Sequence, residues 1–349
     1  MIIMSLKVKI FALLGAIFLI LAALILPYWR FVNQTLKVSI MSALFSNDDL
    51  KMYDNQINFF IGGIGDPTHD GPNLTDSIII ANYNFKTNKL TTISLPRDIW
   101  SPTLKDKINS AYAYGEAKKP GGGFILAKAE LSDIVGMPIQ YAAIIDFSQF
   151  KELVDYLGGV DVNVANSFVD KHFPIDGKEN DPCGGDPTYA CRYQTISFNK
   201  GMTHMDGETA LKFVRSRYAE GPEGTDFARE ARQEKVVDAV KNKVVTMVKK
   251  PNVKTYENLY NIFNRVVKRD LTNQQGAIIA RNIILKGNFK QNRVVVGQEF
   301  FDNPPMGLSQ YNGAWVLVPT GGNYSLIHQY IQCYLQGKSN CEALKNKSK

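Results

Sequence analysis

An uninterrupted apolar stretch near the N-terminus constrains the fold more than any other feature of the sequence. Ile10 to Tyr28 contains no charged residue, and about 20 apolar residues are enough for a helix to cross a bilayer. A cleaved signal peptide is the alternative, but no small-x-small cleavage site follows the stretch. We therefore predict a single-pass anchor over residues 10–29, preceded by a short cytoplasmic N-terminus (1–9) and followed by a juxtamembrane linker (30–56).

Four cysteines indicate on which side of the membrane the folded part lies. Two basic residues flank the apolar stretch on each side, so charge bias does not determine the orientation. The cysteines form two pairs, each eight positions apart, which favours two disulfide loops and an oxidising, extracytoplasmic compartment. A four-cysteine zinc site is the alternative, although its paired ligands are usually closer together. The predicted disulfides join Cys183 to Cys191 and Cys333 to Cys341.

The composition is that of a folded protein with an excess of basic residues. The 349 residues carry a formal net charge of +7 and have a pI near 9.0, which favours anionic partners. Nucleic acid, acidic lipid headgroups, phosphorylated substrates and an anionic polymer all fit this charge. We expect no nucleic-acid partner, because neither a helix-turn-helix nor an interleaving of aromatic and basic residues is recognisable.

Apolar periodicity predicts one α/β domain after the anchor. A buried strand at 57–65 precedes two β-rich segments, 76–84 and 89–95, which "FKTN" joins as a hairpin. A helix-strand-helix-strand alternation follows, beginning with a helix at 122–135. This rhythm predicts a three-layer α-β-α single domain on a mixed central sheet, over residues 57–335.

The second half of the chain has a less regular pattern. Residues 168–193 are polar and hold the first cysteine pair, which predicts a surface loop or lid. Residues 313–331 are expected to form an added strand-helix lobe, and 336–349 a basic tail whose last five residues are disordered. The elements expected here are helices at 226–249, 254–268, 271–285 and 324–334, and strands at 293–296 and 314–318.

Four arginines gather where the longest predicted helix begins: Arg215, Arg217, Arg229 and Arg232. An apolar stripe on that helix consists of Val237, Val240, Val244 and Met247. Extended backwards, the stripe reaches Gln233, Arg229 and Asp226, so these polar residues are expected to face inward. Buried arginines need anionic partners. The cluster is therefore either a structural ion-pair knot around Asp226 or a site for a phosphate group, which suits arginine forks at a helix N-terminus.

Two carboxylates and a fifth arginine lie at the ends of the predicted hairpin strands. Asp76 opens the first strand, and Arg97 and Asp98 follow the second, where ligand residues often lie in open α/β sheets. The start of one hairpin strand lies beside the end of the other, so Asp76 and Asp98 are expected to approach each other. Carboxylates beside arginines predict Mg2+ bound between protein and diphosphate oxygens. The alternative is that each aspartate only caps a turn.

These motifs, in this order, resemble the LytR-CpsA-Psr family of envelope phosphotransferases. "LTDSIIIA", "ISLPRD", "ALKFVRSRY" and "DFAREARQ" are similar to the family's TDT-type, PRD, R-x-R and D-x-x-R-x-x-R-Q motifs. "DFSQFKELVDYLGGVDV" is similar to the passage between them, and the resemblance covers residues 58–248. It implies a membrane-anchored enzyme that moves a glycopolymer, such as teichoic acid or capsule, from a polyprenyl diphosphate carrier to peptidoglycan. A phosphodiester link results.

The resemblance also implies a role for each matching residue. Asp76 matches the family's metal-binding or catalytic aspartate, with Mg2+ or Mn2+ as the cofactor. Ile64 stands where many members carry a second aspartate, so Asp66 or Asp70 is expected to replace it as a metal ligand. Asp98 is expected to take the proton from the attacking sugar hydroxyl. The diphosphate-binding set corresponds to Arg97, Arg215, Arg217, Arg229 and Gln233, supported by Asp226 and Arg232.

Other function classes share parts of this pattern. With water as the nucleophile, the same residues would make a lipid diphosphate hydrolase. A non-catalytic protein that binds an anionic polymer or has a regulatory role needs only the basic charge. A polyprenyl tail also needs an apolar groove, which is expected along residues 122–135 and 147–157. The alternative for these two helices is that they only fill the core.

Overall fold

The computed structural model describes part of the chain: residues 18–347 except 20, 66–72, 179 and 288, without the side chains of 226, 227, 230, 346 and 347. Nearly half of the predicted anchor, including residues 10–17, therefore lies outside the described residues. Within them, we find no helix that combines the length and the apolar character needed to cross a bilayer. The anchor stays a prediction.

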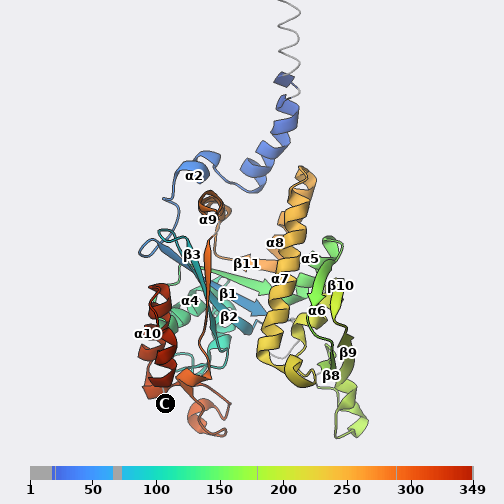
Figure 1. Ribbon diagram of the computed structural model, residues 1–349, viewed down its shortest axis with the longest axis vertical. Coiled ribbons are helices and arrows are strands. Elements are labelled where there is room, and N and C mark those ends of the chain that lie inside the picture. Colours follow the sequence, from blue (N-terminus) through green and yellow to red (C-terminus); the bar gives the residue numbers. More distant parts are fainter. Residues whose placement is uncertain (1–17, 20, 66–72, 179, 288, 348–349) are drawn as a thin grey trace, which may run out of the picture.

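A mixed sheet forms the centre of the domain, as predicted (Figure 1). Three consecutive strands, at 56–64, 75–84 and 89–95, pair as an antiparallel meander. The predicted hairpin is confirmed, because Asn84 lies opposite Lys89. The sheet order is β11 (Val267–Arg269), β6 (Tyr141–Asp146), β1 (Gln56–Ile64), β2 (Thr75–Asn84), β3 (Lys89–Leu95) and β12 (Lys290–Val295). β6 runs parallel to β1, and β12 runs parallel to β3.

Alternating side chains of β1 separate two apolar layers. Phe60 and Ile64 are buried against α3 (Ala111–Lys118), α4 (Gly122–Val135) and α10 (Ser325–Leu335). Ile57 and Phe59 belong to a different cluster, which includes residues of α9 (Asn273–Lys286). Figure 1 shows α4 and α10 on one side of the sheet and α8 (Val253–Val266) on the other. The sheet thus lies between two layers of helices.

A glycine in β1 allows α5 (Phe147–Tyr156) to approach the sheet closely. A Cβ atom on Gly63 would come within 2.6 Å of the Phe147 ring, which is nearer than side chains pack. The predicted helix after β6 begins here, with Asp146 as its N-cap residue accepting from the Ser148 amide at 2.9 Å. The glycine-rich end of β1 therefore allows α5 to pack directly on the sheet.

A second group of elements packs around a core of its own beside the sheet. It contains the pairs β7 (Val160–Val164) with β10 (Gly201–Met205) and β8 (Phe168–Pro174) with β9 (Tyr193–Phe198), and the helices α6 (Gly207–Arg215) and α7 (Asp226–Val248). The predicted surface loop at 168–193 is wrong at its start, because 168–174 form β8. Phe168 and Phe173 are both buried in the core there, because the register shifts between Asp170 and Phe173.

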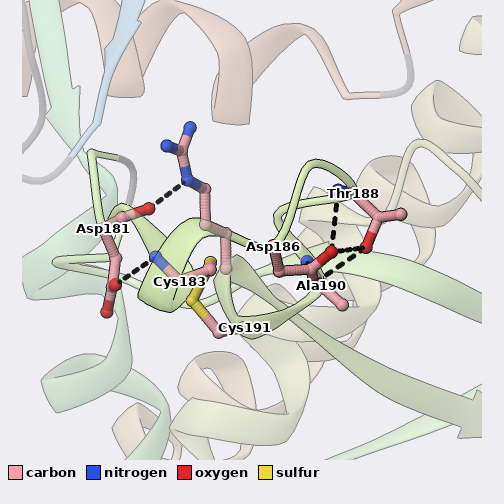
Figure 2. Close-up of a disulfide and its surroundings, with 7 residues drawn as sticks. Asp181, Cys183, Asp186, Thr188, Ala190 and Cys191 are labelled. Atoms are coloured by element: carbon pink, nitrogen blue, oxygen red, sulfur yellow. Dashed lines mark hydrogen bonds between the residues drawn. A yellow bond between two sulfur atoms is a disulfide. The ribbon is translucent and has the colours of Figure 1, made fainter.

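The first predicted disulfide closes the far part of this β8–β9 hairpin (Figure 2). Cys183 is bonded to Cys191, and Asp181 accepts a hydrogen bond from the Cys183 amide at 2.8 Å. Among the described residues, Asp181 and these two cysteines form the single cluster of three acidic, histidine or cysteine side chains close enough to share a metal ion. Because both sulfur atoms are in the disulfide, these two cysteines do not form a zinc site.

The inward face of α7 departs from the predicted stripe at one position. Val236 is 1% exposed and Val237 61%, so the prediction for Val237 is wrong. The buried residue one turn before Val236 is Arg232, at 3% exposure. Its guanidinium lies over the Phe168 ring, 4.8 Å from the centroid. The rest of the predicted stripe is in place: Val240 packs against the smaller core, and Val244 and Met247 are half-buried.

The C-terminal part belongs to the same domain as the sheet and does not form an added lobe. β12 completes one edge of the sheet, and Ile327, Tyr330 and Ile331 of α10 are buried in the cluster that contains Phe60. The second predicted disulfide, Cys333 to Cys341, ties α10 to the tail. The predicted strand at 314–318 is reduced to β14 (Val318–Pro319).

The basic tail is also more ordered than predicted. Residues 341–347 form 3-10 turns, and Lys345 pairs with Glu342 at 2.9 Å and with Glu299 at 3.3 Å. These ion pairs raise the pKa of Lys345, although burial alone would lower it. The expected disorder is therefore wrong for 345–347, while 348–349 lie outside the described residues.

Replacing Ile331 by alanine tests whether α10 and the sheet unfold as one unit. Ile331 is fully buried, so the cavity left behind should lower the free energy of unfolding by about 2–5 kcal/mol. Chemical denaturation should show one transition, displaced to lower denaturant concentration in the variant. Ile284→Ala is the matched control: Ile284 is 76% exposed, and the change should stay within about 0.5 kcal/mol. Two transitions in the wild-type protein would contradict a single unit.

Candidate functional site

A cavity of about 260 Å³ opens at one edge of the central sheet. β1 and β3 end there, β2 begins there, and α5 starts there directly after β6. Such an edge suits a ligand because strand ends and loops present side chains that no neighbouring strand covers. The end of α6, the start of α7 and the end of β8 form the facing wall. The cavity therefore lies between the two cores of the domain.

Six residues predicted from the sequence line this cavity together: Asp76, Arg97, Arg215, Arg217, Arg229 and Gln233. They come from four elements or their ends, and the most distant of them are more than 150 positions apart in the chain (233 − 76). Lys151 of α5 adds a cation that the sequence did not single out. Among the described residues, the cavity thus combines five basic side chains with few acidic ones.

Asp76 and Arg97 form an ion pair at the sheet edge. Arg97 Nη1 donates to Asp76 Oδ1, and Arg97 Nε lies 3.6 Å from Asp98 Oδ2. Burial lowers the pKa of Arg97, but these carboxylates outweigh burial and raise its pKa above the ordinary value. Arg97 is therefore held in its charged form beside Asp76.

Asp98 is the exception among the predicted site residues of the sheet. Its carboxylate accepts from Lys107 Nζ at 2.7 Å, and Asp98 is not one of the described residues that line the cavity. The predicted approach of Asp98 to Asp76 is replaced by an arrangement in which Arg97 lies between them. This placement argues against the predicted role of Asp98 as the proton acceptor.

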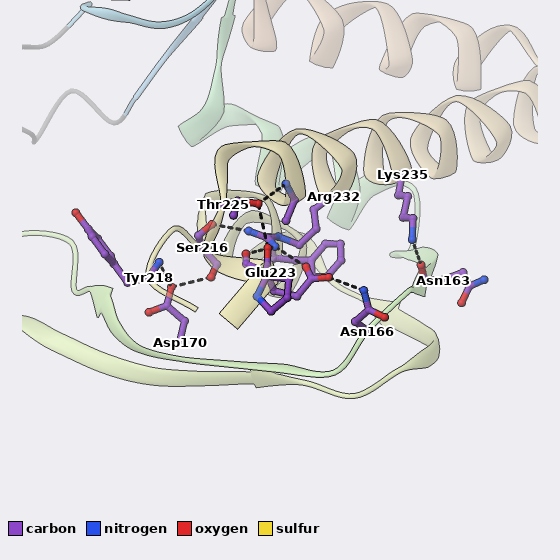
Figure 3. A network of polar contacts seen from close by, with 12 residues as sticks. Asn163, Asn166, Asp170, Ser216, Tyr218, Glu223, Thr225, Arg232 and Lys235 are labelled. Atoms are coloured by element: carbon purple, nitrogen blue, oxygen red, sulfur yellow. Dashed lines mark hydrogen bonds and ion pairs between the residues drawn. The ribbon is translucent and has the colours of Figure 1, made fainter. Parts of the chain in front are cut away.

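Arg232 does not reach the cavity lining and is buried in a polar network instead (Figure 3). Its Nη1 donates to Glu223 Oε2 at 2.9 Å. Its other donors reach the carbonyl oxygens of Phe213 at 3.0 Å, Ser216 at 2.6 Å and Glu223 at 2.9 Å. Burial lowers the pKa of Arg232 despite this carboxylate partner. Glu223 is the acid that makes the burial possible.

This network explains why two cavity arginines are separated by one residue. Ser216 is fully buried, with its carbonyl bound to Arg232 and its hydroxyl donating to Asp170 Oδ2 at 2.7 Å. Ser216 leaves α6 in an extended conformation, with ψ of 129°. Neighbouring side chains in an extended segment point to opposite sides. Fixing Ser216 inward therefore directs Arg215 and Arg217 toward the cavity.

Asp176 also lines the cavity, although no motif or spacing in the sequence singles it out. Its carboxylate accepts from Arg215 Nη1 at 3.1 Å and from Arg215 Nη2 at 2.9 Å. It lies just beyond β8, in the segment expected to be a loop, and its partner is 39 positions away in the chain. A pair of this kind depends on the fold of the hairpin, and no spacing rule could have found it.

Several predicted ligands cannot be placed. Asp66 and Asp70 lie outside the described residues, and the side chain of Asp226 is not described either. Ile64, at the position of the expected second aspartate, is buried in the core below the sheet edge. The predicted metal ligands beside Asp76 therefore stay predictions.

A family model supplies the decisive comparison: the LytR_cpsA_psr model matches residues 32–313, well over half of the chain. The chain belongs to the LytR_cpsA_psr family. The match extends beyond the predicted resemblance at 58–248 and includes β11 and β12. The two outer strands of the sheet are therefore part of the matched region.

Relatives of known name support this membership. A polyisoprenyl-teichoic acid–peptidoglycan teichoic acid transferase TagU from Bacillus cereus is 33% identical over 206 residues, which is 58% of this chain and 56% of that protein. The protein of the same name from Bacillus licheniformis is 28% identical over 224 residues, 63% of this chain and 62% of that protein. The chain thus matches little more than half the length of these relatives.

A solved structure shares the fold. Bacillus subtilis TagV superposes with a TM-score of 0.52 at 23% identity, over 82% of this chain and 99% of that chain. At this identity the likeness supports the architecture alone. The mixed α/β fold with its central sheet is therefore the fold of this family, as predicted.

Replacing Arg232 by methionine tests its structural role. The variant leaves the Glu223 carboxylate and three carbonyl groups without their donor, so the free energy of unfolding should fall by about 3–5 kcal/mol. Adding Glu223→Gln should recover part of this loss, since no uncompensated charge stays buried. Arg217→Met, the same change at an exposed cavity position, should cost less than about 1 kcal/mol. Equal losses in Arg232→Met and Arg217→Met, measured by denaturant unfolding, would refute the structural role.

Proposed function

We propose that this protein is a membrane-anchored transferase that moves a glycopolymer from a polyprenyl diphosphate carrier to peptidoglycan, leaving a phosphodiester link. The observation that carries the proposal is one cavity lined by four arginines beside Asp76. Guanidinium forks make paired, charge-assisted hydrogen bonds to phosphate oxygens. Family membership and the name of the TagU relatives support a transferase that acts on a teichoic acid or a comparable polymer.

Apolar side chains line the rest of the cavity and suit the hydrocarbon tail of the carrier. They are Phe147, Phe173, Pro174, Leu211 and Val214. Of the predicted groove, α5 contributes Phe147, whereas α4 packs its apolar residues into the core on the other side of the sheet. The groove prediction is therefore wrong for 122–135. A lining that combines arginines with apolar side chains matches a ligand that combines a diphosphate with a lipid.

The proposed reaction is a phosphoryl transfer. A sugar hydroxyl of the acceptor forms a P–O bond to the sugar-bearing phosphorus, and the bond from that phosphorus to the bridging oxygen breaks. Polyprenyl phosphate leaves with the electron pair, and a base takes the hydroxyl proton. Charge grows on the phosphate oxygens during this step, and Arg97, Arg215, Arg217 and Arg229 stabilise it because they are already oriented. Gln233 adds a neutral donor on the same wall.

A divalent cation, Mg2+ or Mn2+, is part of the proposal. Asp76 would hold it, since its carboxylate lines the cavity and Mg2+ is often bound by one or two carboxylates together with substrate phosphates. The hydroxyl of Ser77, also in the lining, is a second oxygen donor of the kind this ion accepts. When bound, the cation would supply further positive charge to the diphosphate. Asp66 or Asp70 is proposed to complete its ligands.

The proposed location is the cell membrane, with the catalytic domain on the extracytoplasmic side. The apolar run at 10–28 supports the anchor, and residues 21–30 are helical with Leu24 and Ile25 exposed to solvent. The two disulfides support an oxidising compartment. The chain after this helix is fixed to the domain, because Phe31 packs against Tyr260 with ring centroids 6.4 Å apart.

Arg217→Ala tests the proposed reaction. The full-length protein is incubated in detergent with a polyprenyl diphosphate sugar, Mg2+ and peptidoglycan fragments, and linked product and released polyprenyl phosphate are quantified. The wild-type protein should form both, and Arg217→Ala should lose roughly 10²-fold or more in rate, because one preoriented charge is missing. Arg265→Ala removes an equally charged side chain that pairs with Glu152 and should retain activity.

The same assay separates the rival functions. Release of polyprenyl phosphate without linked product would identify a lipid diphosphate hydrolase. Binding of the lipid without any release would identify a non-catalytic binding protein. The absence of lipid binding in wild type and variant alike would overturn the diphosphate site.

Removing the metal tests the place proposed for it. Diphosphate should raise the unfolding temperature of the wild-type protein more in Mg2+ than in EDTA, and transfer should stop in EDTA and resume with Mg2+. Asp76→Asn should abolish this Mg2+ dependence while leaving the stabilisation by diphosphate alone, which the arginines provide. Glu208→Gln, which removes an acid paired with Lys151, serves as the charge control. Equal stabilisation of the wild-type protein with and without Mg2+ would argue against the cation.

A further inference from the structure

The β8–β9 hairpin places the Asp176 carboxylate against the two terminal nitrogens of Arg215, the atoms that would bind a phosphate group. Both terminal nitrogens of Arg215 donate to the two oxygens of Asp176, at 3.1 and 2.9 Å. Phe173 of the same hairpin lies under the guanidinium, 5.6 Å from ring centroid to Arg215 Cζ. A carboxylate bound end-on in this way has the geometry that a phosphate group adopts with arginine. Asp176 and a bound phosphate therefore compete for Arg215.

The position of Asp176 is determined by the backbone of the hairpin. The amide of Ile175 donates to the carbonyl of Arg192 on the facing chain at 2.9 Å, and the amide of Lys178 donates to the Ile175 carbonyl at 3.1 Å. Arg192 follows Cys191, whose disulfide to Cys183 closes the loop (Figure 2). Arg192 Nε also donates to the Asp181 carbonyl at 2.8 Å. The carboxylate is therefore presented by a constrained turn.

This competition affects the binding of a monophosphate and the binding of a diphosphate differently. A monophosphate that binds Arg215 gains a contact similar to the one that Asp176 gives up. A diphosphate can displace Asp176 and also engage Arg97, Arg217 and Arg229, which line the same cavity. In the proposed reaction the substrate is a lipid diphosphate and one product is a lipid monophosphate. The competing carboxylate would thus allow the diphosphate substrate to bind and would favour release of the monophosphate product.

We propose that Asp176 is a specificity-determining residue of the cavity. Its ion pair with Arg215 competes effectively with a monophosphate and is displaced by a diphosphate. The inference rests on the proposed function, because it assigns the diphosphate to the same arginines. Asp176 and Arg215 are both partly accessible, with side-chain exposures of 42% and 28%. A ligand can therefore exchange with the carboxylate without unfolding the hairpin.

Asp176→Asn tests this inference through the affinities of two probes, inorganic phosphate and inorganic diphosphate, measured by calorimetry on the full-length protein. The amide keeps the shape of the side chain and removes its charge. Phosphate affinity should rise roughly tenfold, since a competing charged hydrogen bond is worth more than 1 kcal/mol. Diphosphate affinity should change less, so the preference for diphosphate should fall. Asp176→Glu should restore the preference.

Controls separate this effect from general electrostatics and from misfolding. Glu220→Gln removes the same charge from an exposed carboxylate that pairs with Lys171 at 2.8 Å, and it should leave both affinities unchanged. In the background of Arg215→Ala, Asp176→Asn should no longer alter phosphate binding, because the shared partner is missing. The unfolding temperature of Asp176→Asn should match that of the wild-type protein.

The outcomes distinguish this inference from the proposed function. If the wild-type protein binds diphosphate and Asp176→Asn leaves the preference unchanged, Asp176 has no such role while the diphosphate site stands. If Asp176→Asn weakens both probes equally, Asp176 only orients Arg215, and the inference is wrong. A wild-type protein that binds neither probe would overturn the diphosphate site and this inference with it.

Discussion

The buried guanidinium of Arg232 holds the geometry on which the cavity depends. A buried charge is tolerated when its hydrogen-bonding groups are satisfied, and Glu223 together with three carbonyl oxygens meets this condition. One of these carbonyls belongs to Ser216, the residue between the two arginines that follow α6. An arginine outside the cavity thus orients two arginines inside it. The D-x-x-R-x-x-R-Q motif contains both kinds, since Arg229 lines the cavity and Arg232, three positions later, is buried.

The cavity also depends on how the two cores of the domain meet. The sheet supplies the pair of Asp76 and Arg97, and the smaller core supplies Arg215, Arg217 and Arg229 on the facing wall. α5 joins the two, since it begins at the sheet edge and packs on α6. The contact of Phe147 with the backbone of Gly63 sets how close they come. A side chain at this glycine would force the Phe147 ring to shift.

Local signals in the sequence were sufficient for much of the fold and part of the site. Alternation predicted the β2–β3 hairpin, and the helices α7, α8, α9 and α10 begin and end within about two residues of their predicted bounds. Motif order predicted which arginines share a cavity. Pairings across the fold were not accessible, because Glu223 with Arg232, Lys107 with Asp98 and Asp176 with Arg215 follow no spacing rule. The inward face of α7 was also predicted incompletely, because one of its buried residues, Arg232, is charged.

The edge strand β12 has a consequence for how the protein reaches its folded state. Lys290 pairs with Lys89, 201 positions earlier (290 − 89), so one edge of the sheet is completed only when most of the chain is available. Contacts of such long sequence separation slow folding. Until then β3 presents an open strand edge, which is a template for pairing with other chains. A chain that is synthesised gradually therefore passes through a period of exposure to aggregation, which ends when its last sixty residues (290–349) are available.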